Sequence, residues 1–150
     1  MNKMHVFYVH THDSGRFWSP YGYAVPTPNI QKLAEDSLLI RHCYSCAPTC
    51  SPSRSALLTG MYPHENGMIG LAHRGFQLND YSQHLVHHLK EHGHKTVLCG
   101  IQHIAPEASM IGYDTIIGSQ EFSMGSTEVS MEDWDRANMG TLCAYLEENN

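Results

Sequence analysis

Residues 50–60 read Cys50-Ser51-Pro52-Ser53-Arg54-Ser55-Ala56-Leu57-Leu58-Thr59-Gly60. The stretch has the features of a short helix, because Pro52 suits a first turn, the alanine and leucines are strong helix formers, and Gly60 stands where a helix ends. Cys50 is then placed at the N-terminal end, where free N–H groups and the positive end of the helix dipole attract anions. Arg54, about one turn further, adds a planar set of donors for an oxyanion. The sequence therefore predicts an anion site around a cysteine.

The composition limits the classes of partner. The 150 residues suffice for one compact domain with a core. Nine Lys and Arg stand against 15 Asp and Glu, and no basic run is present, so we expect no nucleic-acid partner. No apolar stretch approaches the ~20 residues of a membrane span, so we expect no membrane partner. The start of the chain has no signal-peptide pattern, which predicts a cytoplasmic protein.

The cysteines and histidines suggest alternatives to an anion site. Five cysteines are an odd number, which argues against a closed disulfide framework. The spacing Cys43-x2-Cys46-x3-Cys50 is compatible with a metal or iron–sulfur cluster, but no fourth ligand follows at a regular spacing and Cys43 falls in an expected strand. We therefore expect reduced thiols. Five further histidines are expected to form a solvated helix face: His84, His87, His88, His92 and His94.

Hydrophobic patterning predicts alternating strands and helices. The expected strands are Val6–Thr11, Leu38–Tyr44 and Lys95–Cys99. Helices are expected after Thr27, after Ser82 and after Ser130, each of which suits a cap position. This alternation predicts an α/β fold with a mostly parallel central sheet flanked by helices. Ligands of such sheets bind beyond the carboxyl ends of the strands. The polar residues expected at that edge are His12, Asp13, Cys50, Gln102 and His103.

Several segments together resemble one known family. The string C-x-P-S-R-x-x-x-L-T-G at Cys50–Gly60 is the signature of the type I sulfatases, and the chain resembles their N-terminal part, most closely the heparan N-sulfatase (sulfamidase) branch. Further matching segments are Thr27–Ala34, His64–Met68 and Gly100–Pro106. The resemblance implies an alkaline-phosphatase-like sulfatase fold, of which residues 1–150 form an N-terminal, incomplete portion of the catalytic domain.

The resemblance also implies roles for individual residues. Cys50 is the precursor of formylglycine, whose hydrated aldehyde attacks sulfur. Arg54 and His103 are implied to be catalytic, and His64 and Gln102 to contact substrate. A Ca²⁺ ion, or another divalent metal, is implied to be bound by Asp13, His12 and the Cys50 position. Two positions depart from the family: His12 replaces a second aspartate, and Ile101 replaces a sulfate-contacting lysine.

The resemblance implies a hydrolase of sulfuric esters or sulfamates, acting on sulfated saccharides similar to N-sulfoglucosamine, as in the degradation of heparan sulfate and other glycosaminoglycans. Its implied partner is a formylglycine-generating maturation enzyme. Two alternatives remain. One is a phosphonate or phosphodiester hydrolase of the same superfamily. The other is an inactive fragment with a binding role, which His12, Ile101 and the metal ligands expected beyond the chain favour.

Overall fold

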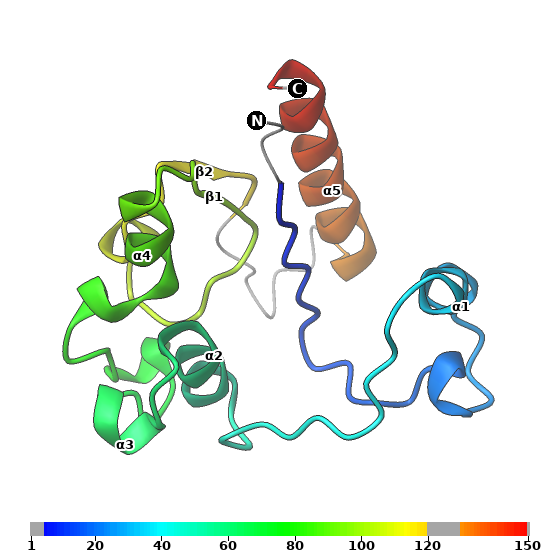
Figure 1. The fold of residues 1–150 in the computed structure, drawn as a ribbon, viewed down its shortest axis with the longest axis horizontal. Helices are drawn as coiled ribbons and strands as arrows, with labels where there is room; N and C mark the ends of the chain where they lie inside the picture. Colours follow the sequence, from blue (N-terminus) through cyan, green and yellow to red (C-terminus); the bar gives the residue numbers. More distant parts are fainter. Residues whose placement is uncertain (1–4, 120–129, 150) are drawn as a thin grey trace. The chain divides into compact units, whose positions relative to one another are not determined.

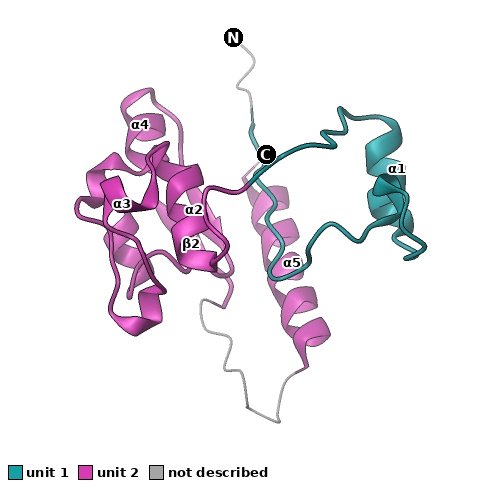
Figure 2. Cartoon of the chain, turned by 90° about the horizontal axis from the view of Figure 1, so that it is seen from below, with its two compact units in different colours: residues 1–44 teal, residues 45–150 magenta. Residues whose placement is uncertain are grey.

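A computed structural model describes residues 5–119 and 130–149 of the chain. The chain divides into two compact units, Met1–Tyr44 and Ser45–Asn150 (Figures 1 and 2).

The first unit contains a 3-10 turn, η1 (Ser19–Tyr21), and one helix, α1 (Pro28–Glu35). The prediction of a helix after Thr27 is confirmed. Thr27 occupies the N-cap position, but its hydroxyl does not cap the helix. Its Oγ1 instead accepts a hydrogen bond from the backbone N–H of Ser19 at 3.1 Å and lies 2.8 Å from the Ser19 hydroxyl. The two elements of this unit are thus joined at Thr27.

Two predicted strands of this unit are wrong. Residues 6–11 and 38–44 are not strands, and their apolar side chains are exposed, Val9 by 75% and Leu38 by 87%. Consequently Cys43 is not in a strand either. A strand needs a neighbouring backbone for its N–H and C=O groups, and no two segments of residues 5–44 form a ladder.

The second unit begins with α2 (Cys50–Thr59), which confirms the helix predicted from the sequence. The helix starts at Cys50 itself, two residues before Pro52. It ends at Gly60, whose φ of 69° lies in the left-handed region, and the N–H of Gly60 donates to the carbonyl of Ala56. A single turn, α3 (Pro63–Asn66), follows, and the short 3-10 helix η2 (Ala72–Arg74) comes next.

Two short strands form a parallel pair in this unit. They are β1 (Val97–Cys99) and β2 (Thr115–Ile117), with Leu98 opposite Ile116 (Figure 1). The strand expected at Lys95–Cys99 is confirmed over its last three residues, whereas β2 was not predicted. The α/β class with parallel pairing is confirmed. Among the described residues the sheet has two strands.

The long helix α5 (Met131–Glu148) packs against this strand pair. The Ser130 hydroxyl accepts a hydrogen bond from the N–H of Asp133, so the predicted cap is confirmed. Asn138 is the buried residue of the helix: its Oδ1 accepts from the N–H of Ser119 at 2.8 Å, and its carbonyl accepts from the Cys99 thiol at 3.4 Å. A polar side chain therefore makes part of the contact between helix and sheet.

The apolar core of the second unit lies beneath α2 and α4 (Leu85–Glu91). Two further 3-10 helices, η3 (Tyr81–Gln83) and η4 (Ala108–Ile111), contribute to its boundary. The Tyr81 hydroxyl, at the core edge, donates to the carbonyl of Ile104 at 3.1 Å. The core consists of Met68, Leu78, Val86, Ile104, Ala105 and Ile111.

The start of α4 differs from the prediction. Ser82 lies in η3, and the N-cap of α4 is His84, whose Nδ1 accepts from the N–H of Val86 at 3.1 Å. His84 is only 1% exposed, so the expected solvated histidine face is wrong at this position. An imidazole nitrogen can replace the usual oxygen acceptor at a helix start, and this role draws the ring inward. His88, His92 and His94 are exposed as expected.

A carboxylate ties α4 to the strand pair. Asp114 Oδ2 accepts hydrogen bonds from the N–H and hydroxyl of Thr96 at 2.8 and 2.9 Å, and Oδ1 lies 2.9 Å from Lys90 Nζ. The Thr96 backbone bond first, and then the Lys90 and Thr96 side chains, lower the pKa of Asp114 to about 2.

None of the described helices has the length and apolarity to cross a bilayer.

Candidate active site

The site of the second unit is built on the first turn of α2. Cys50 is the first residue of this ten-residue helix and is half-buried, so its side chain lies at the positive end of the helix dipole. The five cysteines all lie in the described parts of the chain, and none of them forms a disulfide. An anion or a polar group derived from Cys50 is stabilised at such a position by the helix dipole.

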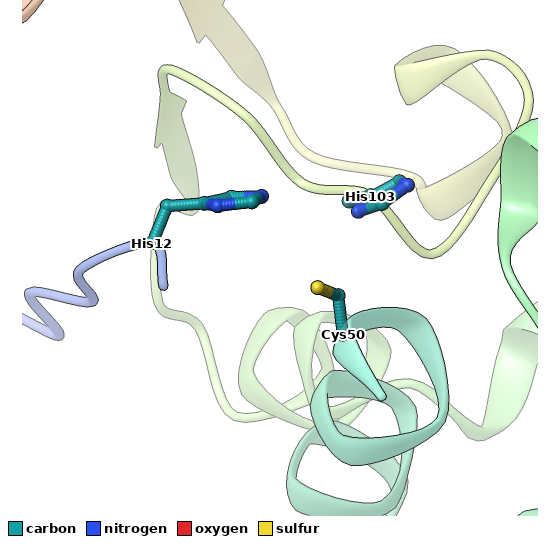
Figure 3. A group of neighbouring side chains, drawn as sticks. All are labelled: His12, Cys50 and His103. Carbon is teal, nitrogen blue, oxygen red and sulfur yellow. The ribbon is translucent and has the colours of Figure 1, made fainter. Parts of the chain in front are cut away.

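His103 is brought close to Cys50 by the loop that follows β1. The Cys50 Sγ lies within 4.8 Å of a ring nitrogen of His103, and Figure 3 shows the two side chains near each other. The backbone of His103 has a φ of 54°, in the left-handed region that a non-glycine residue rarely occupies. Such strain is found where surrounding contacts hold a residue in one place. The predicted proximity of Cys50 and His103 is therefore confirmed.

Arg54 lies one turn after Cys50 on the same helix. Its Nη1 donates to the carbonyl of Ile101 at 3.5 Å, so the guanidinium is directed to the loop that leads to His103. Ile101, where the resemblance implies the loss of a lysine, contacts Arg54 through its main chain. Arg54 thus joins the helix of Cys50 to the loop of His103 and brings a permanent positive charge to that region.

The two residues predicted to contact substrate have different surroundings. Gln102 folds back on its own loop: Oε1 accepts from the N–H groups of Ile104 and Ala105 at 2.6 and 2.8 Å, and Nε2 donates to the Ala105 carbonyl. These bonds brace the loop beside His103. His64 is exposed on α3, with its ring stacked on Tyr62 at 5.7 Å. Substrate contact by either residue stays a prediction.

The predicted metal ligands His12 and Asp13 lie in the first unit. His12 Nδ1 lies 3.0 Å from Asp13 Oδ2, so the two side chains form an ion pair when the histidine is protonated. Asp13 has a φ of 52°. Within the described parts of the chain, Asp13 and His103 are the two non-glycine residues with a positive φ.

The donor set does not match a calcium site. Calcium takes six to eight oxygen ligands, whereas the predicted ligands offer one carboxylate from Asp13, an imidazole from His12 and an oxygen from formylglycine once Cys50 is modified. The Asp13 carboxylate is also engaged by the neighbouring imidazole. These three residues alone do not form a calcium shell.

Three residues that support the site were not predicted. Ser51, fully buried next to Cys50, accepts a hydrogen bond at Oγ from the N–H of Ala72 at 3.1 Å. His73, the next residue, pairs with His103. Asn66 is 1% exposed, and its amide bonds Ser55 and Thr59 of α2. No periodicity or spacing connects these positions. The only signal in the sequence for Asn66 is an amide before a glycine.

Comparison with known proteins identifies relatives of one kind. A family model described as Sulfatase matches residues 5–147. The chain is 38% identical over 86 residues to the human N-sulphoglucosamine sulphohydrolase, which is 56% of this chain and 17% of that protein. It is 34% identical over 103 residues to an ulvan-active sulfatase of Formosa agariphila, 68% of this chain and 20% of that protein.

A shorter match has a higher sequence identity. The human N-acetylgalactosamine-6-sulfatase is 48% identical over 54 residues, which is 33% of this chain and 10% of that protein. The matched stretches thus span a fifth or less of these relatives. No solved structure gives a significant match to the chain.

Proposed function

Because the chain belongs to the sulfatase family, we propose that it carries the nucleophile of a site that hydrolyses sulfate esters or sulfamates. The observation that carries the proposal is the position of Cys50: first residue of α2, within 4.8 Å of a His103 ring nitrogen, with Arg54 one turn away. A helix start and a guanidinium stabilise the negative charge of a sulfuryl group, and an imidazole can transfer a proton.

Formylglycine derived from Cys50 is part of the proposal. The local structure fits the modification, because Cys50 is half-buried and follows an exposed segment, residues 41–46, that a maturation enzyme can reach. When formed, the group supplies an oxygen nucleophile in place of the thiol. The partner that we propose is therefore a formylglycine-generating enzyme.

The residues of the chain have separate tasks in the proposed reaction. The positive end of the α2 dipole favours an oxyanion at Cys50, and Arg54 offsets negative charge on the sulfuryl oxygens. His103 is near enough to Cys50 to move a proton to the departing alcohol or amine. Gln102 braces the loop of His103, and His64 remains our candidate for contact with the saccharide.

The metal and the substrate are the finer parts of the proposal. We propose a divalent cation, calcium by family resemblance, for which Asp13 and the group derived from Cys50 are the oxygen donors among the predicted ligands. Since these ligands do not complete a calcium shell, no step above depends on the ion. The substrate that we propose is an N-sulfated glucosamine, since the chain is similar over 56% of its length to a protein named for that sulphohydrolase activity.

The test is a substrate panel on the product of the whole reading frame, co-expressed with a maturation enzyme. Wild type and Cys50→Ala are compared on N-sulfoglucosamine, an aryl sulfate and a phosphonate monoester. We expect sulfate release from the first two by the wild type and none by Cys50→Ala. Faster turnover of the phosphonate would favour the phosphonate hydrolase alternative, and no turnover by a protein with modified Cys50 would favour a binding role.

A further inference from the structure

His73 and His103 form a side-chain pair beside Cys50. Nδ1 of His73 lies 2.9 Å from Nε2 of His103, and the two ring planes differ by only 13° with centroids 5.2 Å apart. Rings that meet edge to edge at this separation share one hydrogen between two nitrogens. One ring therefore donates an N–H and the other accepts it.

This bond determines which nitrogen of His103 carries a proton. A neutral imidazole has one N–H, so if His73 donates to Nε2, the proton of His103 is on Nδ1. If His103 donates from Nε2 instead, its Nδ1 carries a lone pair. The bond is lost when both rings are protonated, because two N–H groups then face each other. While paired, the two rings hold at most one positive charge.

The loop that carries His73 is attached to the turn that carries Cys50. His73 lies in η2, and the N–H of the preceding Ala72 donates to Ser51 Oγ at 3.1 Å. Ser51 is fully buried and directly follows Cys50. The position of the His73 ring is thus set relative to Cys50 through a short, buried connection.

The loop that carries His103 is attached to the same helix. Arg54 Nη1 donates to the carbonyl of Ile101, and the three bonds of Gln102 close the loop after His103. Both histidine loops are therefore attached to α2 by hydrogen bonds. The hydrogen bond between the two rings connects the loops to each other near Cys50. A surface histidine without a role in the site needs no such placement.

We propose that His73 is a positioning residue of the sulfatase reaction, which holds the ring of His103 in one orientation and one tautomer beside Cys50. The inference rests on the proposed function, because it takes His103 as the group that moves the proton. His73 itself does not contact the reacting atoms.

The test compares three substitutions in the product of the whole reading frame, with rates expressed per aldehyde at position 50. His73→Phe keeps a flat ring and removes the hydrogen bond. His73→Asn places an amide near the former Nδ1 and can restore it. His94→Phe changes an exposed histidine elsewhere and is the matched control. Ring ¹⁵N shifts of His103, measured by NMR on the 150-residue chain, report its tautomer independently of activity.

We expect His73→Phe to lower kcat by about 10- to 100-fold, as is usual for the loss of an outer partner of a site histidine, with KM within about twofold. His73→Asn should recover most of the rate. Wild-type kcat in His73→Phe, or an equal loss in His73→Asn, would overturn the inference while the proposed function stands.

An inactive wild type would contradict the proposed function, and the NMR measurement then decides the inference alone. We expect His73→Phe to change the ¹⁵N shifts of His103 toward a mixture of tautomers, and His94→Phe to leave them unchanged. A His103 tautomer that is the same in wild type and His73→Phe would overturn the inference.

Discussion

The hydroxyl of Ser51 accepts a hydrogen bond from the backbone N–H of Ala72 at 3.1 Å, and this bond connects the first turn of α2 with the loop of His73. Ser51 has no exposed surface, and Ala72 is 3% exposed. A buried N–H has no access to replacement water, so the bond matters more than a surface bond of the same length.

Ser51→Ala is expected to destabilise the second unit by about 1–3 kcal/mol, since it leaves the Ala72 N–H buried without an acceptor. Urea denaturation of the 150-residue chain measures this loss. Ser53→Ala, in the same helix, removes an exposed hydroxyl pair with Ser45 and should cost less. Equal losses in the two variants would show that the buried Ser51 bond contributes no more to stability than the exposed Ser53 bond.

Asn66 is a second polar residue on which the placement of α2 depends. Its Nδ2 donates to Ser55 Oγ and Thr59 Oγ1, and its Oδ1 accepts from the N–H of Met68. Asn66→Ala leaves several buried groups without partners, so we expect a loss of about 2–4 kcal/mol in the free energy of unfolding. Asn149→Ala, at the exposed end of α5, is the control. A loss below that of the control would contradict this role.

Stability should depend on pH through His84. Burial first, and the nearby His87 second, lower the pKa of His84 to about 4 in the fold, from 6.5. The fold thus favours the neutral ring, whereas the unfolded chain binds a proton below pH 6.5. The contribution of neutral His84 to the free energy of unfolding is therefore fully present above pH 6.5. It is lost as the pH falls toward 4, by up to about 3 kcal/mol.

A variant separates this effect from general acid unfolding. His84→Asn keeps an acceptor for the N–H of Val86 and removes the titrating ring. Urea denaturation between pH 7 and pH 4 should show a smaller decrease in stability for His84→Asn than for the wild type. Parallel pH profiles would mean that His84 does not carry the dependence.

Arg54→Ala is expected to lower kcat/KM for sulfate release by about 10²- to 10³-fold, as for the loss of one donor to a developing oxyanion. Arg54→Lys keeps the charge without the planar fork and should lie between. Arg136→Ala, which removes an exposed pair with Glu132, is the control. Rates must be divided by the aldehyde content at position 50, because Arg54 also belongs to the signature that the maturation enzyme reads. A wild-type rate per aldehyde in Arg54→Ala would refute the assignment.

The parts of the fold that the sequence predicts correctly are those with local causes. The helical state of α2 follows from its helix-forming residues and its end from Gly60, and the start of α5 follows from Ser130. These features act within one or two turns of chain. The family signature around Cys50 is equally local, and it places Arg54 on the same helix as Cys50.

The parts that were mispredicted depend on distant partners. Val6–Thr11 and Leu38–Tyr44 have the composition of strands, but composition does not supply a neighbouring backbone. His84 was placed on a solvated face, whereas the need for a cap at α4 draws it into the core. His73 was missed because its partner, His103, is 30 residues away, and no periodicity connects them.

The central claim is that Cys50 is the precursor of the nucleophile, and mass spectrometry of the peptide that contains Cys50 tests it most directly. The whole reading frame is co-expressed with a formylglycine-generating enzyme, beside a sulfatase of known maturation as a positive control. The account predicts conversion of Cys50 to the aldehyde in the wild type and its loss in a Cys50→Ala variant. A Cys50 peptide that stays entirely in the thiol form, while the control sulfatase is converted in the same cells, would contradict the account.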